Sequence, residues 1–491
     1  MQPSDHTAVS GSPSVRRLVA ALMVPFLTMI IMMAMFTVAV PFVRIEQGLT
    51  PDEASWLLVA YTLPNMMLMP LFGRLGDGLG KRRLLLMGVT LFVGGTALLT
   101  VARTFPLILL ARVIQGAGAS GINPLALAMI VEFALPEQRG KAMGTWNSSG
   151  PVAGMIGPLI AGPLIDAFGW RSILIPALAI GVSAVVIMWL SLPRSDPHVS
   201  TRRMIRSLDW TGVLLFNGSV ALLVFFTSSR PITGAAPLTD LRLLVPGVSL
   251  LVAFIWWSLR RADPFIDFSI FRERNFTVAS VVVSLRMVLR GGTSFLLPLF
   301  LTDLYNLNAA ATGSFLMLDA GALLVTMWLG GIVIDRRKSR SQVVVGLAVE
   351  AVAMLAYMLL PPGAPVIWVF TIQAVNALGA GYCLAALHLY AMSAVQPEKS
   401  ATAAGLYSMI RFAGAMLGPA IGGVVLAAAV ARSGVSFAAY RPAFGFLLVV
   451  IAAGTLLALG LTRRVPARLA VPNRSPVPAD SASGTGSRTN A

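Results

Sequence analysis

The sequence predicts an all-α protein that crosses a membrane many times. Of its 491 residues, 56% are hydrophobic and only 12% are charged, whereas soluble domains are about 45–50% apolar and about 25% charged. The mean hydropathy is +0.80. A helix needs about 20 mainly apolar residues to cross the hydrocarbon core, and runs of this length recur along the whole chain. These observations together indicate a polytopic membrane protein.

Fourteen apolar runs are long enough to span a membrane. We expect spans at about 18–43, 54–72, 84–102, 105–133, 142–165, 172–192, 210–228, 243–259, 277–302, 311–334, 342–361, 364–394, 402–430 and 442–462. An even number of spans places both termini on the same side. We expect the segment 1–17 to precede the first span and the tail 463–491, rich in Pro, Ser and Gly, to be disordered.

The distribution of positive charge predicts the orientation of these spans. Of the 37 Lys and Arg residues, 26 fall on the side of the termini, 7 on the other side and 4 within spans. Positive residues in short loops mark the cytoplasmic face. We therefore expect both termini in the cytoplasm, and we interpret the net charge of +17 as an orientation signal and not as a nucleic-acid surface.

The composition offers little support for an enzyme. Cys383 is the single cysteine, so an internal disulfide is excluded, and three scattered histidines form no metal-ligand pattern. The apolar run after Arg16 and Arg17 is too long for the apolar region of a signal peptide, so we expect it to stay as the first span. Neither a cofactor nor a metal ion is expected.

The loop between the second and third spans, GRLGDGLGKRR, contains four basic residues and an aspartate. Its glycines suit a tight turn, and its basic residues suit an anionic membrane surface. The loop resembles the signature G-x-L-x-D-x-x-G-[RK]-[RK] of the major facilitator superfamily, matched by Gly73, Leu75, Asp77, Gly80, Lys81 and Arg82. A weaker copy follows the tenth span and includes Asp335 and Arg336. In that family the loop helps to control alternating access, so the resemblance implies a gating role.

The fourth span contains RVIQGAGAS, which begins at Arg112 and includes Gln115. It resembles the R-x-x-Q-G-x-G element of the same family. An arginine within hydrocarbon is costly unless it is paired or hydrated, so we expect Arg112 to face the interior of the bundle. The alternative is that Arg112 only bonds the carbonyl groups of neighbouring helices.

The fifth span contains GPVAGMIGPLIAGPL. Small residues about four positions apart allow close helix packing, which is an adequate explanation by itself. Because the segment follows the Arg112 element, it also resembles the antiporter motif of proton-coupled exporters. The residues that carry this motif are Gly150, Pro151, Gly154, Gly157, Pro158 and Gly162.

The number of spans narrows the resemblance to the fourteen-helix drug:proton antiporters. DWTG, which starts at Asp209, and DPFIDFSIFRERNF, which ends at Phe276, resemble the linkers around the extra helix pair of that subfamily. The resemblance implies a major facilitator fold with two six-helix bundles, at 18–192 and 277–462, and two extra central helices within 193–276.

The sequence departs from the subfamily in its first span, where Met32 stands at the position of a frequent acidic residue. If transport is coupled to proton movement, buried charged residues outside the first span must provide the coupling. Arg286 and Arg290 lie one helical turn apart, at a depth similar to that of Asp319, so we expect an ion pair between an arginine and Asp319. We expect Glu350 to brace helices and Glu132 to reach the membrane surface.

The resemblance places spans one, four, nine and twelve around a central cavity. Candidate cavity residues are Met32, Met35, Phe36, Gln115, Asn123, Phe295, Gln373 and Asn376. Methionine and aromatic side chains suit varied apolar ligands, but they are equally ordinary in a helix core. Arg286 and Arg290 outnumber Asp319, which would make the cavity positive. The possibility of an anionic or zwitterionic cargo therefore stays open.

The resulting prediction is a monomeric secondary transporter of the cytoplasmic membrane that exports drugs or amphipathic molecules in exchange for protons. Two alternatives stay open: a facilitator or symporter of an organic anion, and a membrane sensor of the same fold that transports nothing.

Overall fold

The chain folds into a bundle of long helices. In a computed structural model, the described residues are 15–133, 136–193, 208–227, 234–261, 264–337, 340–396 and 400–463. Within these ranges the regular structure is helical and strands are absent. The described residues contain 14 helical segments that are long and apolar enough to cross a membrane. The predicted all-α class and the predicted number of spans are therefore confirmed.

The first helices pack on one another to form a group that we call the N-half, which includes the pairs α1–α6, α3–α4 and α3–α7. Its elements are α1 (Val15–Gln47), α2 (Pro51–Leu79), α3 (Lys81–Val101), α4 (Phe105–Ala119), α5 (Ile122–Phe133), α6 (Pro136–Phe168), η1 (Trp170–Ile173) and α7 (Leu174–Ser191).

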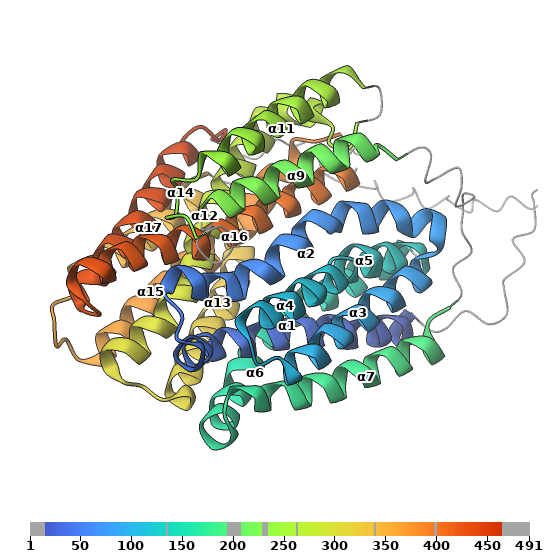
Figure 1. Cartoon of the computed structure of the whole chain (residues 1–491). Helices are drawn as coiled ribbons and strands as arrows, with labels where there is room; N and C mark the ends of the chain where they lie inside the picture. The colour runs from blue at the N-terminus through green and yellow to red at the C-terminus, as the bar shows by residue number, and fades with distance from the viewer. Residues whose placement is uncertain are drawn as a thin grey trace, which may run out of the picture.

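The last helices form a second group, the C-half, in which α12 packs on α16 and α14 packs on α15 and α17. Its elements are α12 (Arg274–Tyr305), α13 (Ala309–Arg337), α14 (Arg340–Leu359), α15 (Val366–Ser393), α16 (Ser400–Ser433) and α17 (Phe437–Ala458). Figure 1 shows the two groups side by side. We call the end of the bundle where α1 begins and α17 ends the termini end, and the opposite end the far end.

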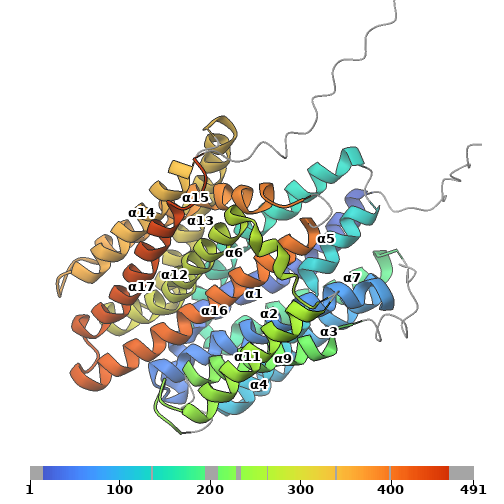
Figure 2. The ribbon, with the colours of Figure 1, turned by 90° about the horizontal axis from the view of Figure 1, so that it is seen from above.

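Two further helices, α9 (Trp210–Thr227) and α11 (Leu241–Arg260), pack on each other. Figures 1 and 2 show them along the outside of the bundle, beside α2 and α16. Phe225 of α9 stacks on Trp56 of α2, with the ring centroids 5.2 Å apart, and Val224 packs in the same apolar cluster as Met416 of α16. The pair therefore covers the line along which the N-half meets the C-half.

Asp209 fastens the start of this helix pair to its end. Its carboxylate accepts hydrogen bonds from the backbone of Gly212 (3.0 Å), the indole of Trp257 (2.9 Å) and the backbone of Phe265 (3.0 Å). Burial alone would raise the pKa of Asp209, but these hydrogen bonds bring it below the usual value. The carboxylate thus explains why the DWTG segment begins with an aspartate.

The predicted fourth span is one membrane crossing but two helices. α4 ends at Ala119 and α5 begins at Ile122, with a short turn in which the amide of Ser120 bonds the carbonyl of Ala117. Close packing accompanies the break, since a Cβ added to Gly121 would lie 2.3 Å from the Phe72 ring. The predicted span at 105–133 is confirmed as one crossing, Phe105–Ile130, with a break within it that the sequence analysis did not predict.

Candidate functional site

An ion pair lies near the middle of the C-half. Arg290 of α12 places its Nη1 atom 2.5 Å from Oδ2 of Asp319 on α13. Asp319 is ten residues from the start of α13, so it lies about 15 Å along the helix and deep in the membrane-spanning segment. The Asp319 side chain is 3% exposed, whereas that of Arg290 is 31% exposed. The structure therefore brings together the arginine and the aspartate that the sequence suggested.

Asp319 has a second partner on another helix. Its Oδ1 atom accepts a hydrogen bond of 2.7 Å from the amide of Gln373 on α15, and the Gln373 carbonyl accepts one of 3.3 Å from the hydroxyl of Tyr357 on α14. Four helices thus contribute to one buried polar chain. Asp319 thus connects α13 to α12 through Arg290 and to α15 through Gln373.

Arg286 pairs with a different carboxylate. Its Nε atom lies 3.4 Å from Oε1 of Glu350, and both side chains are 3% exposed. Our sequence interpretation counted Arg286 and Arg290 against Asp319 alone and so left a positive surplus. Glu350 adds a second carboxylate to that count, but Arg411 of α16, which interacts electrostatically with Arg286, adds a third arginine. These buried groups therefore carry one positive charge in excess, and an anionic or zwitterionic cargo stays open.

Arg112 lies in the N-half and has a different set of contacts. It is fully buried and donates to the carbonyl of Leu57 (2.9 Å) and to the side chain of Gln115 (3.0 Å). Its guanidinium lies over the rings of Phe36 (4.1 Å) and Tyr61 (4.6 Å). Arg112 thus faces the interior of the bundle as expected and forms a brace between α1, α2 and α4, and its role in transport stays a prediction.

The residues predicted to line a central cavity are distributed among several such contacts. Gln115 belongs to the brace, where its amide also donates to Thr96 (2.8 Å). Asn123 accepts a hydrogen bond of 3.1 Å from the indole of Trp146, and Gln373 belongs to the Asp319 chain. The remaining predicted cavity residues share deep burial: Met32, Met35, Phe36, Phe295 and Asn376.

The signature loop forms a tight turn between α2 and α3. Gly80 has φ of +86°, a conformation that favours glycine. Lys81 pairs with Glu132 of α5 at 2.6 Å, and Arg82 donates to the carbonyl of Trp189 on α7. We expected Glu132 to reach the membrane surface, and the structure gives it this partner at the termini end.

Three predicted gating residues lie on helices whose backbone is described. Asp77 is in the last turns of α2, and Asp335 and Arg336 are in the last turn of α13. Their side chains lie outside the described part of the structure. Their gating role stays a prediction.

The predicted antiporter motif lies on α6 and packs in two directions. A Cβ added to Gly157 would lie 2.7 Å from the Ala34 side chain on α1, within the N-half. A Cβ added to Gly162 would lie 2.6 Å from Ala310 on α13, and a Cβ added to Gly313 of α13 would lie 2.4 Å from the carbonyl oxygen of Pro158. The motif's small residues therefore bring α6 against both its own half and the C-half.

Polar contacts join the two halves at the far end. Arg44 at the end of α1 pairs with Asp303 of α12 at 2.7 Å, and Tyr440 of α17 donates to the same carboxylate at 2.7 Å. Asp166 of α6 accepts hydrogen bonds from the first two backbone amides of α13, at Ala309 and Ala310, both at 2.9 Å. A side chain of the N-half thus caps a helix of the C-half.

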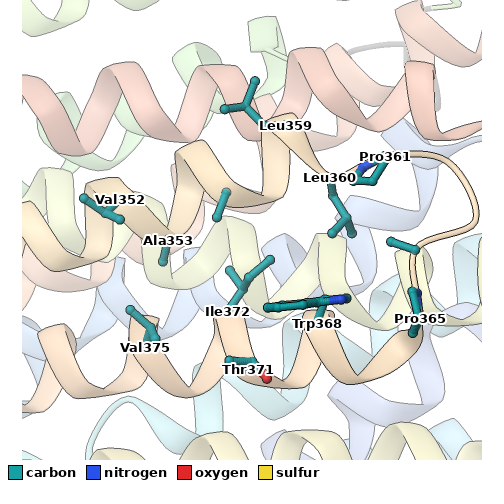
Figure 3. A pocket seen from close by; sticks show the side chains of 12 residues that line it. Val352, Ala353, Leu359, Leu360, Pro361, Pro365, Trp368, Thr371, Ile372 and Val375 are labelled. Carbon is teal, nitrogen blue, oxygen red and sulfur yellow. The ribbon is translucent and has the colours of Figure 1, made fainter.

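Two cavities flank α15 on the outside of the C-half. One, of about 470 Å³, lies between α14 and α15, and Figure 3 shows Trp368 and Ile372 of α15 beside Leu360. The other, of about 500 Å³, lies between α13 and α15 and has Asp319 and Gln373 among its lining residues. Among the described residues, no group of three or more His, Cys, Asp or Glu has the arrangement of a metal site.

Sequence reasoning missed three of these features: the Glu350–Arg286 pair, the Arg44–Asp303 pair and the Asp166 cap. The Glu350–Arg286 pair could have been predicted from depth, because both residues lie at similar distances from the termini end of their helices. The other two pairs connect loop-proximal residues of different halves. Their proximity depends on how the halves meet, which periodicity does not encode.

The fold and the site define a multi-pass membrane protein with two helical groups, a polar centre deep in one group and polar contacts between the groups at one end. The model of the Major Facilitator Superfamily matches residues 22–419, and the chain belongs to this family. Its fourteen candidate spans fit the fourteen-helix subfamily.

Two relatives illustrate the similarity. The chain is 28% identical to "Multidrug resistance protein B homolog" of Mycobacterium tuberculosis (strain ATCC 25618 / H37Rv) over 397 residues, which cover 77% of this chain and 70% of the relative. It is also 28% identical to "Uncharacterized MFS-type transporter YhcA" of Bacillus subtilis (strain 168), covering 74% and 67% of the two chains.

Among solved structures, the fold is similar to that of a bacterial homologue of the human lysosomal transporter Spinster. The TM-score is 0.67 and the sequence identity is 16%, and the match covers 91% of this chain and 97% of the other. At this identity the likeness concerns the fold alone.

Proposed function

We propose that this protein is a secondary active transporter that exports amphipathic small molecules in exchange for protons. The observation that carries the proposal is the Arg290–Asp319 pair, a carboxylate almost entirely buried in mid-span beside a partly exposed guanidinium. Ionisable residues within membrane-spanning helices are costly and typically mark ion or substrate pathways. The names of relatives that are called multidrug resistance proteins support the choice of cargo class.

The proposed coupling step is the protonation of Asp319. A proton on this carboxylate removes the negative charge that holds Arg290, and the freed guanidinium then rearranges on α12. Because Gln373 also bonds Asp319, the same event loosens α15. Met32 occupies the usual acidic position of the first span, so the C-half carries the coupling in this proposal.

The proposed transport cycle is alternating access between two bundles with limits at 18–192 and 277–462. In the described state the far end is closed by Arg44–Asp303, by the Asp166 cap and by the close packing of Gly162 on α13. The cycle requires these contacts to separate when the far end opens. In this proposal the protein lies in the cytoplasmic membrane with both termini in the cytoplasm, so the far end faces the outside of the cell.

The test uses inverted membrane vesicles and a panel of fluorescent amphipathic dyes, with an imposed pH gradient present or absent. The wild-type chain is expected to accumulate at least one dye only when the gradient is present. Asp319→Asn is expected to abolish gradient-driven accumulation while dye still equilibrates down its own gradient. Asp240→Asn, a conservative change in the α9–α11 connection, is the matched control and is expected to behave as wild type.

Three outcomes would contradict parts of the proposal. Full gradient-driven accumulation by Asp319→Asn would limit this residue to an ion-pair brace. Transport that ignores the pH gradient in the wild type would remove proton coupling and favour a facilitator. Dye binding without flux in every condition would favour the sensor alternative.

A further inference from the structure

Arg411 of α16 carries a positive charge that no carboxylate of the described residues balances. It lies eleven residues after the start of α16, about 16 Å along the helix. No aspartate or glutamate in the described part of the chain forms an ion pair with Arg411, and its buried Nε atom has no hydrogen-bond partner there. An arginine within a membrane is costly unless it is paired or hydrated. Arg411 therefore requires a partner from outside this set of side chains.

A second arginine lies close to Arg411 on the neighbouring helix. Arg286 of α12 has a similar depth, about 18 Å from the start of its helix, and interacts electrostatically with Arg411. The two helices approach each other closely at this level, since a Cβ added to Gly414 would lie 2.2 Å from the carbonyl oxygen of Ser284. The packing of α12 on α16 thus holds two like charges together inside the membrane.

The carboxylates of the C-half balance only part of this charge. Oε1 of Glu350 lies 3.4 Å from Nε of Arg286, but that Nε atom makes no hydrogen bond within the described residues. Asp319 is paired with Arg290, so three arginines and two carboxylates leave one positive charge in excess. Water can solvate this charge but cannot neutralise it, whereas one monovalent anion can do both in surroundings of low dielectric constant.

A tyrosine beside the two arginines also lacks a hydrogen-bond partner. The Tyr407 hydroxyl is buried and unpartnered among the described residues, and it interacts electrostatically with both Arg286 and Arg411. Tyr407 is four residues before Arg411, so both side chains lie on one face of α16. A buried donor that stays unsatisfied destabilises a fold. The Nε atoms of the two arginines and the Tyr407 hydroxyl therefore all lack an acceptor.

This group of side chains is accessible to water on one side. Arg411 is half-buried, and His388 of α15, whose ring lies edge-on to that of Tyr407 with centroids 5.6 Å apart, is exposed. Ionisable side chains in spanning helices face the interior of a bundle or a hydrated opening. A small ion dissolved in water can therefore reach Arg411 without crossing lipid.

We propose that Arg286, Arg411 and Tyr407 form a binding site for a small monovalent inorganic anion, such as chloride, between α12 and α16. An anion accepts hydrogen bonds from all three unpartnered donors, and its single charge equals the excess. Bound there, it reduces the repulsion between the two arginines and stabilises the packing of α12 on α16. The site depends neither on the proposed export of amphipathic molecules nor on its coupling to protons.

The experiment measures the binding of radioactive chloride to the full chain in nanodiscs of zwitterionic lipid, with gluconate keeping the ionic strength constant. Saturable binding is expected, with displacement by bromide at lower concentrations than by acetate. Arg411→Gln is expected to weaken binding by about tenfold or more, because it removes a charged donor. Arg432→Gln removes a charge from the exposed last turn of the same helix. It is the matched control and is expected to bind chloride as wild type.

Tyr407→Phe is the second variant and decides the matter if Arg411→Gln does not fold. It removes only the hydroxyl, so chloride binding is expected to weaken by about two- to tenfold. Thermal unfolding then separates an anion site from a purely structural tyrosine. The wild-type midpoint is expected to be higher in chloride than in gluconate. Tyr407→Phe is expected to lose most of this difference without unfolding earlier in gluconate, because its hydroxyl has no partner when the anion is absent.

Four outcomes would overturn the proposed site. Three concern chloride itself: no saturable binding, equal binding by wild type, Arg411→Gln and Tyr407→Phe, or a loss in Arg432→Gln as large as that in Arg411→Gln. The fourth is displacement of chloride by acetate at lower concentrations than by bromide. That result would assign the arginines to a carboxylate, such as that of an anionic cargo, and reject the inorganic anion.

Discussion

Asp166 offers a direct way to perturb the closed far end. Its carboxylate belongs to the N-half, yet it accepts hydrogen bonds from the first two backbone amides of α13 in the C-half. Asp166→Ala removes both acceptors and leaves the rest of α6 unchanged. Because these bonds exist only while the halves touch, the substitution is expected to favour the state in which the far end is open.

The size of the effect follows from the chemistry of helix caps. Loss of a capping side chain costs about 0.5–2 kcal/mol, and the negative charge at a helix N-terminus contributes about 0.3–1 kcal/mol. Since the Asp166 side chain is exposed, we expect a total of about 1–2 kcal/mol. That changes the ratio of open to closed far ends by about five- to thirtyfold.

The assay is double electron–electron resonance between spin labels at Ala167→Cys on α6 and Pro362→Cys in the connection between α14 and α15. Both positions are exposed at the far end, and the native Cys383 is buried. Asp166→Ala is expected to increase the population with the longer distance.

The matched control for this assay is Asp240→Ala, which removes a cap of α11 within the helix pair. It is expected to leave the distance distribution unchanged. If Asp166→Ala also leaves it unchanged, the cap between the halves does not stabilise the closed far end, and the reasoning from its two hydrogen bonds fails.

Three further predictions follow from the buried charges and the topology. Glu350→Gln leaves Arg286 buried without a charged partner, so we expect a loss of about 3–5 kcal/mol in unfolding free energy. The double change of Glu350 and Arg286 to Met is expected to restore most of it, and an unaltered thermal midpoint for Glu350→Gln would contradict the pair. Asp77→Asn is expected to leave insertion intact but to reduce vesicle transport sharply, and wild-type flux would reduce the loop to an orientation signal. Reporter fusions after Arg17 and after Arg464 are both expected in the cytoplasm, and a periplasmic signal from either would reject the orientation.

The fold was predictable because the lipid environment imposes a simple rule on the chain. A spanning helix must be apolar for about 20 residues, so the number of spans could be read from the apolar runs. The break between α4 and α5 was not predictable in the same way. At the break Gly121 packs against Phe72 of another helix, a contact that local composition does not contain.

The polar centre was partly predictable. The pairing of Arg290 with Asp319 was anticipated from their similar depth along helices of known rise. Depth alone did not decide which arginine would pair with Asp319. Glu350 was expected to brace helices, but no partner was predicted for it, and the structure pairs it with Arg286. Contacts between residues far apart in sequence depend on the rotation of each helix about its own axis, which tertiary packing determines.

The helix pair α9–α11 shows how many spanning helices can be inserted between the two halves without changing their contacts. Two helices inserted between the halves return the chain to the side from which it left, so every later helix keeps its direction. A single inserted helix would invert α12 to α17, and Asp166 would then meet the wrong end of α13. Only insertions of an even number of spans preserve the pairing of Arg44 with Asp303 and the cap on α13. Proteins with this pair of halves can therefore contain only an even number of spans between them.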